Sequence, residues 1–129
     1  MQEGDAKKTV RVMLVEDQVP FRRAIAYLLD REPDLEVVAQ AGSVDEARSH
    51  AASVGFDVAI LDLGLPDGNG VDLVAELRVA SPSAAVLIMS ASLDPANFAK
   101  AEEAGADGVL DKFARPGELV DAIRRLGNW

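Results

Sequence analysis

Short apolar runs alternate along this chain with segments whose apolar residues recur at helical spacing, and this alternation restricts the possible folds more than any other feature. Val10–Val15 is the first apolar run. It is followed by Phe21, Ile25, Leu28 and Leu29, which occupy positions i, i+4, i+7 and i+8 and therefore share one face of a helix. Repetition of such strand-helix units along a chain predicts a parallel sheet.

Four further apolar runs continue this pattern. Ala84–Met89 is apolar at every position, as expected for a strand that helices cover on both faces. Helix starts lie between the runs, because Ser43–Glu46 has the sequence of a capping box and Asp94 precedes Pro95. We therefore expect an α/β fold with five parallel strands and five helices in a single domain. The other expected strands are Leu35–Ala39, Asp57–Leu61 and Gly108–Asp111.

Length and charge narrow the class of protein further. The 129 residues are the size of one domain, and no Pro/Ser-rich linker divides them. We expect residues 9–126 to form the domain, with an N-terminal tail at 1–8 and a C-terminal tail at 127–129. The net charge of −9 opposes direct nucleic-acid binding by this domain, because such binding depends on clustered Lys and Arg.

The sequence contains no segment with the composition of a membrane anchor or a secretory signal. No stretch approaches the roughly 20 consecutive apolar residues of a spanning helix, and no apolar run follows the charged residues at the start. We therefore expect a cytoplasmic protein without membrane association. Without cysteine, the chain forms neither disulfides nor thiolate metal sites.

Polar and charged residues stand where the expected strands end. Glu16 and Asp17 follow the first strand, Asp62 the third and Ser90 the fourth, while Lys112 follows the fifth. Each residue alone is common as a helix cap or loop residue. In an open parallel sheet, however, ligands bind beyond the carboxyl ends of the strands, so all five are candidates for one site.

Three carboxylates at one edge of a sheet call for a cation. Each pair repels by about 4 kcal/mol at 4 Å with an effective dielectric near 20. Mg²⁺ suits such a cluster, because it binds one or two carboxylates, retains waters and bridges to phosphoryl oxygens. Lys112 adds a positive charge and Ser90 a hydroxyl donor. With an aspartate as nucleophile, this group of residues is suited to phosphoryl transfer.

Four motifs carry these residues in a fixed order: Leu14–Asp17, Leu61–Pro66 together with Gly70, Met89–Ala91 and Gly105–Lys112. Together they resemble the motifs of response-regulator receiver domains from two-component signalling. The resemblance extends from about Thr9 to Leu126, nearly the whole chain. It implies the flavodoxin-like receiver fold, a doubly wound (βα)5 sandwich with strand order 2-1-3-4-5.

The resemblance also implies a phosphoacceptor and a metal site. Asp62 would accept the phosphoryl group. Glu16 and Asp17 would be the acidic pair that holds Mg²⁺ together with Asp62. The backbone carbonyl of Gly64 would be a further protein ligand of the metal.

Ser90 and Lys112 would contact the phosphoryl group in a domain of this kind. The phosphoryl group would come from a sensor histidine kinase, and its transfer would change a surface used by a downstream effector or output domain. Such a domain is not an enzyme acting on other substrates, since it catalyses only its own phosphotransfer and dephosphorylation. A homodimer linked to phosphorylation is a further partner that the family suggests.

Within the family, the chain looks most like receivers that precede helix-turn-helix output domains of the NarL/FixJ (LuxR) type. The resemblance rests on Phe21–Arg23, on Glu36–Gly42 and on Phe113, where many receivers have a cis proline. A cis bond before Phe113 would cost about 3 kcal/mol, so we expect either a trans bond or a strained exception. These 129 residues contain no such output domain, and we expect DNA binding to lie outside them.

Three positions bear on how closely the chain follows the receiver pattern. Val109 stands three residues before the lysine, where receivers usually have an aromatic switch residue. Gly64 stands two residues after Asp62, where the family often has a larger side chain that shields the acyl phosphate from water. We therefore expect a phosphate on Asp62 to be more open to hydrolysis than in those relatives. Asp67 lacks the neighbouring oxygen ligands of a calcium loop and is expected to be a turn residue.

Three other functions are alternatives to a phosphorylated receiver. A pseudo-receiver that binds proteins without phosphorylation is favoured by Val109 and opposed by Asp62 and Lys112. A phosphatase with Asp62 as nucleophile would need a second aspartate where Gly64 stands. A flavodoxin-like cofactor site would need a phosphate-binding loop after the first strand, where Glu16–Gln18 would repel a phosphate.

Overall fold

The structure, a computed structural model, consists of five strand-helix units and a small hairpin, and it describes residues 9–91 and 94–127. The expected N-terminal tail at 1–8 and residues 128–129 of the expected C-terminal tail lie outside the described residues. The elements are β1 (Val10–Val15), α1 (Val19–Asp30), β2 (Leu35–Ala41), α2 (Val44–Ser53), β3 (Val58–Asp62), β4 (Gly64–Leu65), β5 (Gly68–Asn69), α3 (Gly70–Ala80), β6 (Ala85–Ser90), α4 (Pro95–Glu103), β7 (Gly108–Asp111) and α5 (Pro116–Gly127).

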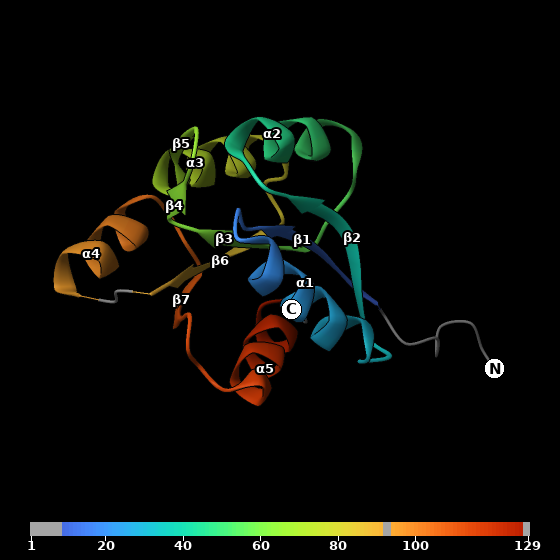
Figure 1. Cartoon of the computed structure of the whole chain (residues 1–129). Helices are drawn as coiled ribbons and strands as arrows, with labels where there is room; N and C mark the ends of the chain where they lie inside the picture. The colour runs from blue at the N-terminus through green and yellow to red at the C-terminus, as the bar shows by residue number, and fades with distance from the viewer. Residues whose placement is uncertain (1–8, 92–93, 128–129) are drawn as a thin grey trace.

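Five of these strands form one parallel sheet in the order β2-β1-β3-β6-β7. Without the hairpin strands β4 and β5 this is the order 2-1-3-4-5, so the predicted doubly wound fold is confirmed. Helices α2 and α3 cover one face of the sheet and α1 and α5 the other, while α4 lies beside β6 and β7 (Figure 1). All five strands of this sheet run in one direction, so their carboxyl ends meet at one edge.

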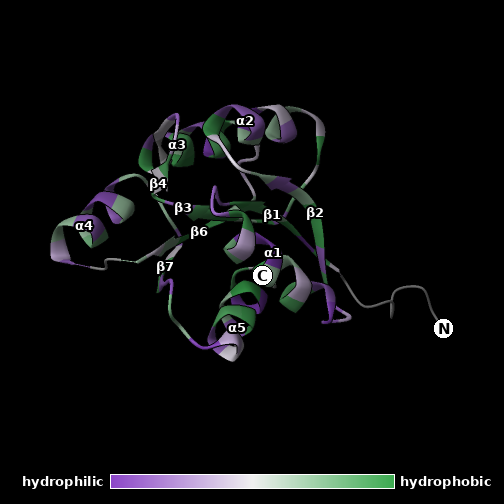
Figure 2. Cartoon of the chain, in the orientation of Figure 1, coloured by the Kyte–Doolittle hydropathy of each residue, from purple (hydrophilic) through white to green (hydrophobic). Residues whose placement is uncertain are grey.

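The central strands are apolar throughout because both of their faces are buried. In β3, Val58 and Ile60 pack with α1 and α5, whereas Ala59 and Leu61 pack with α2 and α3. Successive side chains of a strand point to opposite faces, so one short run contributes to two separate cores. The hydropathy view shows mainly apolar central strands between helices that contain both apolar and polar residues (Figure 2).

Side chains cap two helices where the sequence predicts. The Ser43 hydroxyl accepts a hydrogen bond from the backbone N–H of Glu46 at 3.2 Å, and the Asp94 carboxylate accepts one from Asn97 at 2.8 Å. The Glu46 carboxylate accepts from the N–H of Gly42 at 2.6 Å, one residue before the one that a capping box uses. Both helix starts are therefore fixed by short-range contacts.

Strands β3 and β6 lie one residue later than expected, at Val58–Asp62 and Ala85–Ser90, and two other elements extend beyond their expected ends. Strand β2 continues to Ala41 because it pairs with β1 up to the register Val15 with Ala41. Helix α5 continues to Gly127, which is buried so close to β1 that a Cβ there would lie 2.6 Å from Val10. Gly127, the first residue of the expected C-terminal tail, therefore belongs to the last helix.

Two further expectations can be compared with the described residues. All of their peptide bonds are trans, including the bond between Lys112 and Phe113. No described helix combines the length and the apolar content that crossing a membrane requires.

Candidate functional site

Three carboxylates meet at the carboxyl edge of the sheet. Glu16 and Asp17 follow β1, Asp62 is the last residue of β3, and these two strands are neighbours in the sheet. One oxygen atom from each of the three side chains lies within 4.8 Å of the others. The strand order thus brings together the acidic residues that the sequence predicts for one site.

Lys112 lies among these carboxylates after the end of β7. Its Nζ atom is 2.9 Å from Oε1 of Glu16 and 3.3 Å from Oδ2 of Asp62, and its side chain is only 9% exposed. The same atom donates a hydrogen bond to Oε1 of Gln18 at 3.2 Å. It also lies 4.8 Å from the centre of the Phe21 ring, a cation-π contact. The lysine is therefore held in a fixed position.

Burial and charge shift the pKa values of the central pair in the site. Burial raises the pKa of Glu16, which is only 3% exposed, and the nearby charge of Asp62 raises it further, against the opposing effect of Lys112. Burial alone would lower the pKa of Lys112, but its hydrogen bond to Glu16 and the charges of both carboxylates outweigh burial and raise it. The ammonium form of the lysine is thereby stabilised.

The turn that carries Glu16 is fixed by contacts from three directions. Its backbone N–H donates to the carbonyl of Ala41 at 2.9 Å, and its carboxylate accepts from the N–H of Gln18 at 2.9 Å. A guanidinium nitrogen of Arg22 donates to its carbonyl at 2.8 Å. Sequence reasoning did not identify Arg22 or Gln18 as part of the site, since both contacts depend on the fold of this turn.

The loop after Asp62 approaches α3 too closely for a side chain at one position. A Cβ on Gly70 would lie 2.6 Å from the carbonyl oxygen of Asp62 and 3.0 Å from Cα of Leu63. The N–H of Gly70 donates to the carbonyl of Leu63 at 3.1 Å. At Gly64, whose N–H donates to Oδ1 of Asp62 at 3.3 Å, a Cβ would meet no described heavy atom within 4 Å. Among the described residues, the space next to the Gly64 backbone is therefore open.

Asp67 connects this loop to another helix. It lies between the hairpin strands, as expected for a turn residue, but its carboxylate also accepts the backbone N–H groups of Val44 at 2.7 Å and Asp45 at 3.1 Å. These bonds from the start of α2 lower the pKa of Asp67. The hairpin beside the candidate phosphoacceptor is thus attached to α2, a contact between residues more than 20 positions apart that the sequence did not predict.

Ser90 completes the set of predicted side chains. It is the last residue of β6 and is 5% exposed, and its carbonyl accepts the backbone N–H of Lys112 at 2.9 Å. A cleft of about 380 Å³ opens beside it. The cleft is lined by Asp62, Leu63, Gly64, Val71, Ser90, Ala91, Asn97 and Lys100. The last two residues come from α4 and were not among the predicted site residues.

A doubly wound five-stranded domain with an acidic cluster, a buried serine and a paired lysine at one edge of its sheet has the make-up of a signal-receiver domain. The family model described as the response regulator receiver domain matches residues 12–124. The chain therefore belongs to the response regulator receiver domain family.

Known relatives agree with this assignment. The DNA-binding transcriptional activator DevR/DosR of Mycobacterium tuberculosis is 38% identical over 118 residues, which are 92% of this chain and 54% of that protein. The chain spans about half the length of the curated relatives it matches.

Solved structures give the same result. A LuxR-family response regulator from Aurantimonas sp. has a TM-score of 0.86 and 34% identity, with 92% of this chain and 85% of that chain covered. A Burkholderia pseudomallei response regulator with a phosphorylated aspartic acid, calcium ion and citrate has a TM-score of 0.82 and 28% identity, with 88% and 66% covered. The predicted likeness to NarL/FixJ (LuxR-type) receivers is confirmed by relatives of that type.

Proposed function

We propose that Asp62 accepts a phosphoryl group from a sensor histidine kinase in a Mg²⁺-dependent reaction, and that the domain relays the signal by a change of conformation. The observation that carries this proposal is the meeting of the Glu16, Asp17 and Asp62 carboxylates within 4.8 Å, with Lys112 3.3 Å from Asp62. Asp62 thus lies close both to a cation and to the carboxylates that would hold a metal ion.

In the transfer step a carboxylate oxygen of Asp62 attacks phosphorus, and the bond from phosphorus to the donor breaks with its electron pair on the leaving group. Anion approaches anion in this step, so positive charge around the phosphoryl oxygens lowers the barrier. The fixed ammonium group of Lys112 provides such charge, and the hydroxyl of Ser90 can donate a hydrogen bond to a phosphoryl oxygen.

The acidic cluster fits Mg²⁺, a hard ion that prefers oxygen ligands and binds through one or two carboxylates. Glu16, Asp17, Asp62 and the backbone carbonyl of Gly64 are the groups that would hold it. When bound, the ion supplies further positive charge for the phosphoryl oxygens. The phosphorylated aspartic acid and calcium ion of the Burkholderia pseudomallei regulator support the same pairing of acceptor and divalent cation in this chain.

The signal would pass to an output domain outside these residues. DevR/DosR, a DNA-binding activator, is about twice the length matched here, which supports a role of this domain in transcription regulation by a longer protein. In this role the domain acts in the cytoplasm and catalyses only its own phosphotransfer and dephosphorylation. Phosphorylation would alter a surface used by the output domain or by a second copy of the chain.

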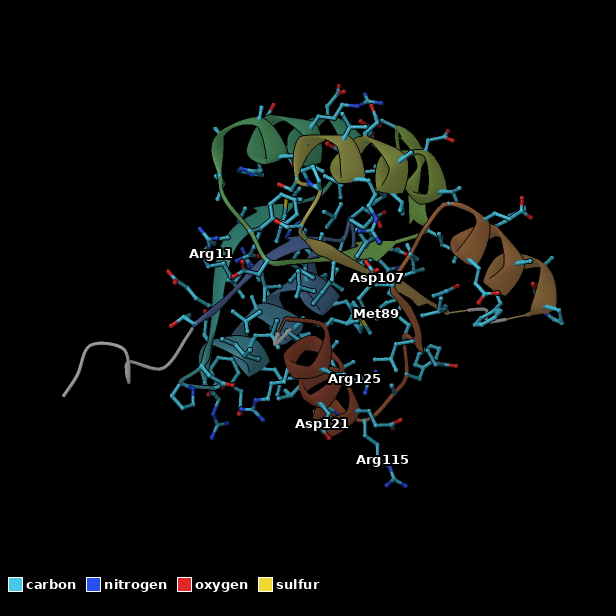
Figure 3. The ribbon with its side chains drawn as sticks, turned by 180° about the vertical axis from the view of Figure 1, so that it is seen from behind. Arg11, Met89, Asp107, Arg115, Asp121 and Arg125 are labelled. Atoms are coloured by element: carbon cyan, nitrogen blue, oxygen red, sulfur yellow. The ribbon has the colours of Figure 1, made fainter. Side chains whose placement is uncertain are left out.

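Intact-mass measurement after incubation with Mg²⁺ and acetyl phosphate tests the proposal. We expect the wild-type chain to gain the mass of one phosphoryl group and Asp62→Asn to gain none. Asp121→Asn is a matched control, because Asp121 is an exposed carboxylate of α5 (Figure 3). A wild-type chain that gains no mass would contradict the proposal and favour a phosphorylation-independent binding module, in line with Val109 at the switch position.

A further inference from the structure

The cleft beside Asp62 continues away from the acidic cluster toward α4. Its lining includes Gly64, which has no side chain, Ala91, which has a small one, and Asn97 and Lys100 from α4. These last two residues are three positions apart on α4 and so share one face of that helix. The volume of about 380 Å³ exceeds what a single phosphoryl group would fill.

Lys100, the cation that lines the cleft from α4, differs from Lys112, the cation next to Asp62. Lys112 is already paired with Glu16 and Asp62, whereas Lys100 is exposed and forms no ion pair with any residue that the structure describes. A divalent ion and Lys112 together only balance the three carboxylates of the site. The charge of an incoming anionic donor is therefore left for Lys100 to offset.

We propose that the α4 side of this cleft is a binding site for the leaving group of small acyl phosphates, with Lys100 as the residue that binds the departing carboxylate. This inference rests on the proposed function, because it concerns the donor in the phosphorylation of Asp62.

Transfer from a donor to Asp62 requires room for the leaving group in this cleft. Attack on phosphorus is roughly in line, so the departing oxygen lies on the side of phosphorus away from Asp62. The bond between phosphorus and the acyl oxygen breaks, the carboxylate leaves with the electron pair, and a new bond joins phosphorus to the Asp62 oxygen. Lys100 stabilises the negative charge that develops on the carboxylate.

Two donors with different leaving groups separate this role from a general effect of charge. Acetyl phosphate releases acetate, an anion, whereas phosphoramidate releases neutral ammonia when its phosphorus-nitrogen bond breaks. Only the first leaving group gains from a cation at its end of the cleft. The ratio of the two phosphorylation rates therefore reports on the leaving-group site.

The experiment measures initial rates of mass gain with each donor, at fixed Mg²⁺, pH and ionic strength. For Lys100→Met, which keeps the length of the side chain, we expect the acetyl phosphate rate to fall about threefold to fivefold, the range for a partly exposed ion pair. The phosphoramidate rate should change much less. Lys100→Arg should restore most of the acetyl phosphate rate.

Arg125→Met is the matched control, because it removes the same charge from an exposed residue of α5, apart from α4 (Figure 3). It should leave the ratio of the two rates as in the wild type. An unchanged ratio in Lys100→Met, or an equal change in Arg125→Met, would overturn the inference while leaving Asp62 as the phosphoacceptor. A wild-type chain that neither donor phosphorylates would instead contradict the proposed function itself.

Discussion

The Nζ atom of Lys112 lies 2.9 Å from Oε1 of Glu16, and both side chains are almost completely buried. The lysine thus neutralises one of the carboxylates that would also bind a metal ion. A fixed cation and a bound divalent ion would repel each other across this short distance. We therefore predict that the position of Lys112 favours phosphoryl transfer and opposes metal binding.

Lys112→Met should separate these two effects. Without the ammonium group the acidic cluster is more negative, so we expect Mg²⁺ to bind at least about threefold more tightly. Phosphorylation by acetyl phosphate should slow by about 100-fold, because a group that stabilises the transition state is lost. Calorimetric titration with Mg²⁺ and intact-mass kinetics measure the two effects.

The control for this change is Arg125→Met, which alters the net charge equally but lies on an exposed part of α5. It should leave both the Mg²⁺ affinity and the phosphorylation rate close to those of the wild type. Weaker Mg²⁺ binding by Lys112→Met would show that the lysine supports the metal site and that the predicted opposition is wrong.

Gly70→Ala should destabilise the domain and displace the phosphoacceptor loop. The added methyl group would lie 2.6 Å from the carbonyl oxygen of Asp62, so the backbone must shift, at a cost of about 1 to 3 kcal/mol in unfolding free energy. Urea denaturation measures this cost. Gly117→Ala is the matched control, because a Cβ there meets no described heavy atom within 4 Å and alanine favours the helix. Equal stability of the two variants would contradict the prediction.

The fold could be predicted because its determinants are local. The apolar runs at β1, β3 and β6 and the caps at Ser43 and Asp94 are patterns within a few residues, and each lies at the predicted position or one residue from it. The hairpin β4–β5 was missed because strands of two residues leave no periodic signal. The extra residues of β2 were missed because pairing with a neighbouring strand determines where it ends.

The site could be predicted only in part, for a related reason. Residues that end parallel strands meet at one edge whatever their separation in sequence, so Asp62 and Lys112 could be placed together. Contacts made by loops and by helix faces follow no such rule. The hydrogen bonds of Asp67 to α2 and the position of Lys100 along the cleft depend on the three-dimensional path of the chain.

Asp67→Asn should lower the melting temperature in a pH-dependent way. Hydrogen bonds from the N–H groups of Val44 and Asp45 lower the pKa of Asp67 in the folded state below the ordinary value of about 3.9. A group of this kind contributes stability above its unfolded pKa and loses that contribution as pH falls through its folded pKa. The variant should therefore melt below the wild type at neutral pH, and the difference should shrink below about pH 4.

Calorimetric melting curves over a pH series check this prediction, with Asp121→Asn as a control on an exposed carboxylate. The control should melt with the wild type throughout the series. If the difference in melting temperature between Asp67→Asn and the wild type stays constant down to acid pH, the charge of Asp67 does not contribute to its hydrogen bonds with the start of α2.

Gly64→Asn should lengthen the lifetime of the phosphate on Asp62. A Cβ at this position meets no described heavy atom within 4 Å, so the substitution begins in open space. The larger side chain would then stand between the acyl phosphate and the open cleft, and hydrolysis requires water to approach phosphorus from that side. We expect a several-fold longer lifetime, measured as loss of the phosphoryl mass after the donor is removed. Gly64→Ala, which adds only a methyl group, should have a smaller effect. If Gly64→Asn loses phosphate as fast as the wild type or faster, the open space at Gly64 does not limit the lifetime, and the exposure of the phosphate must be determined elsewhere in the site.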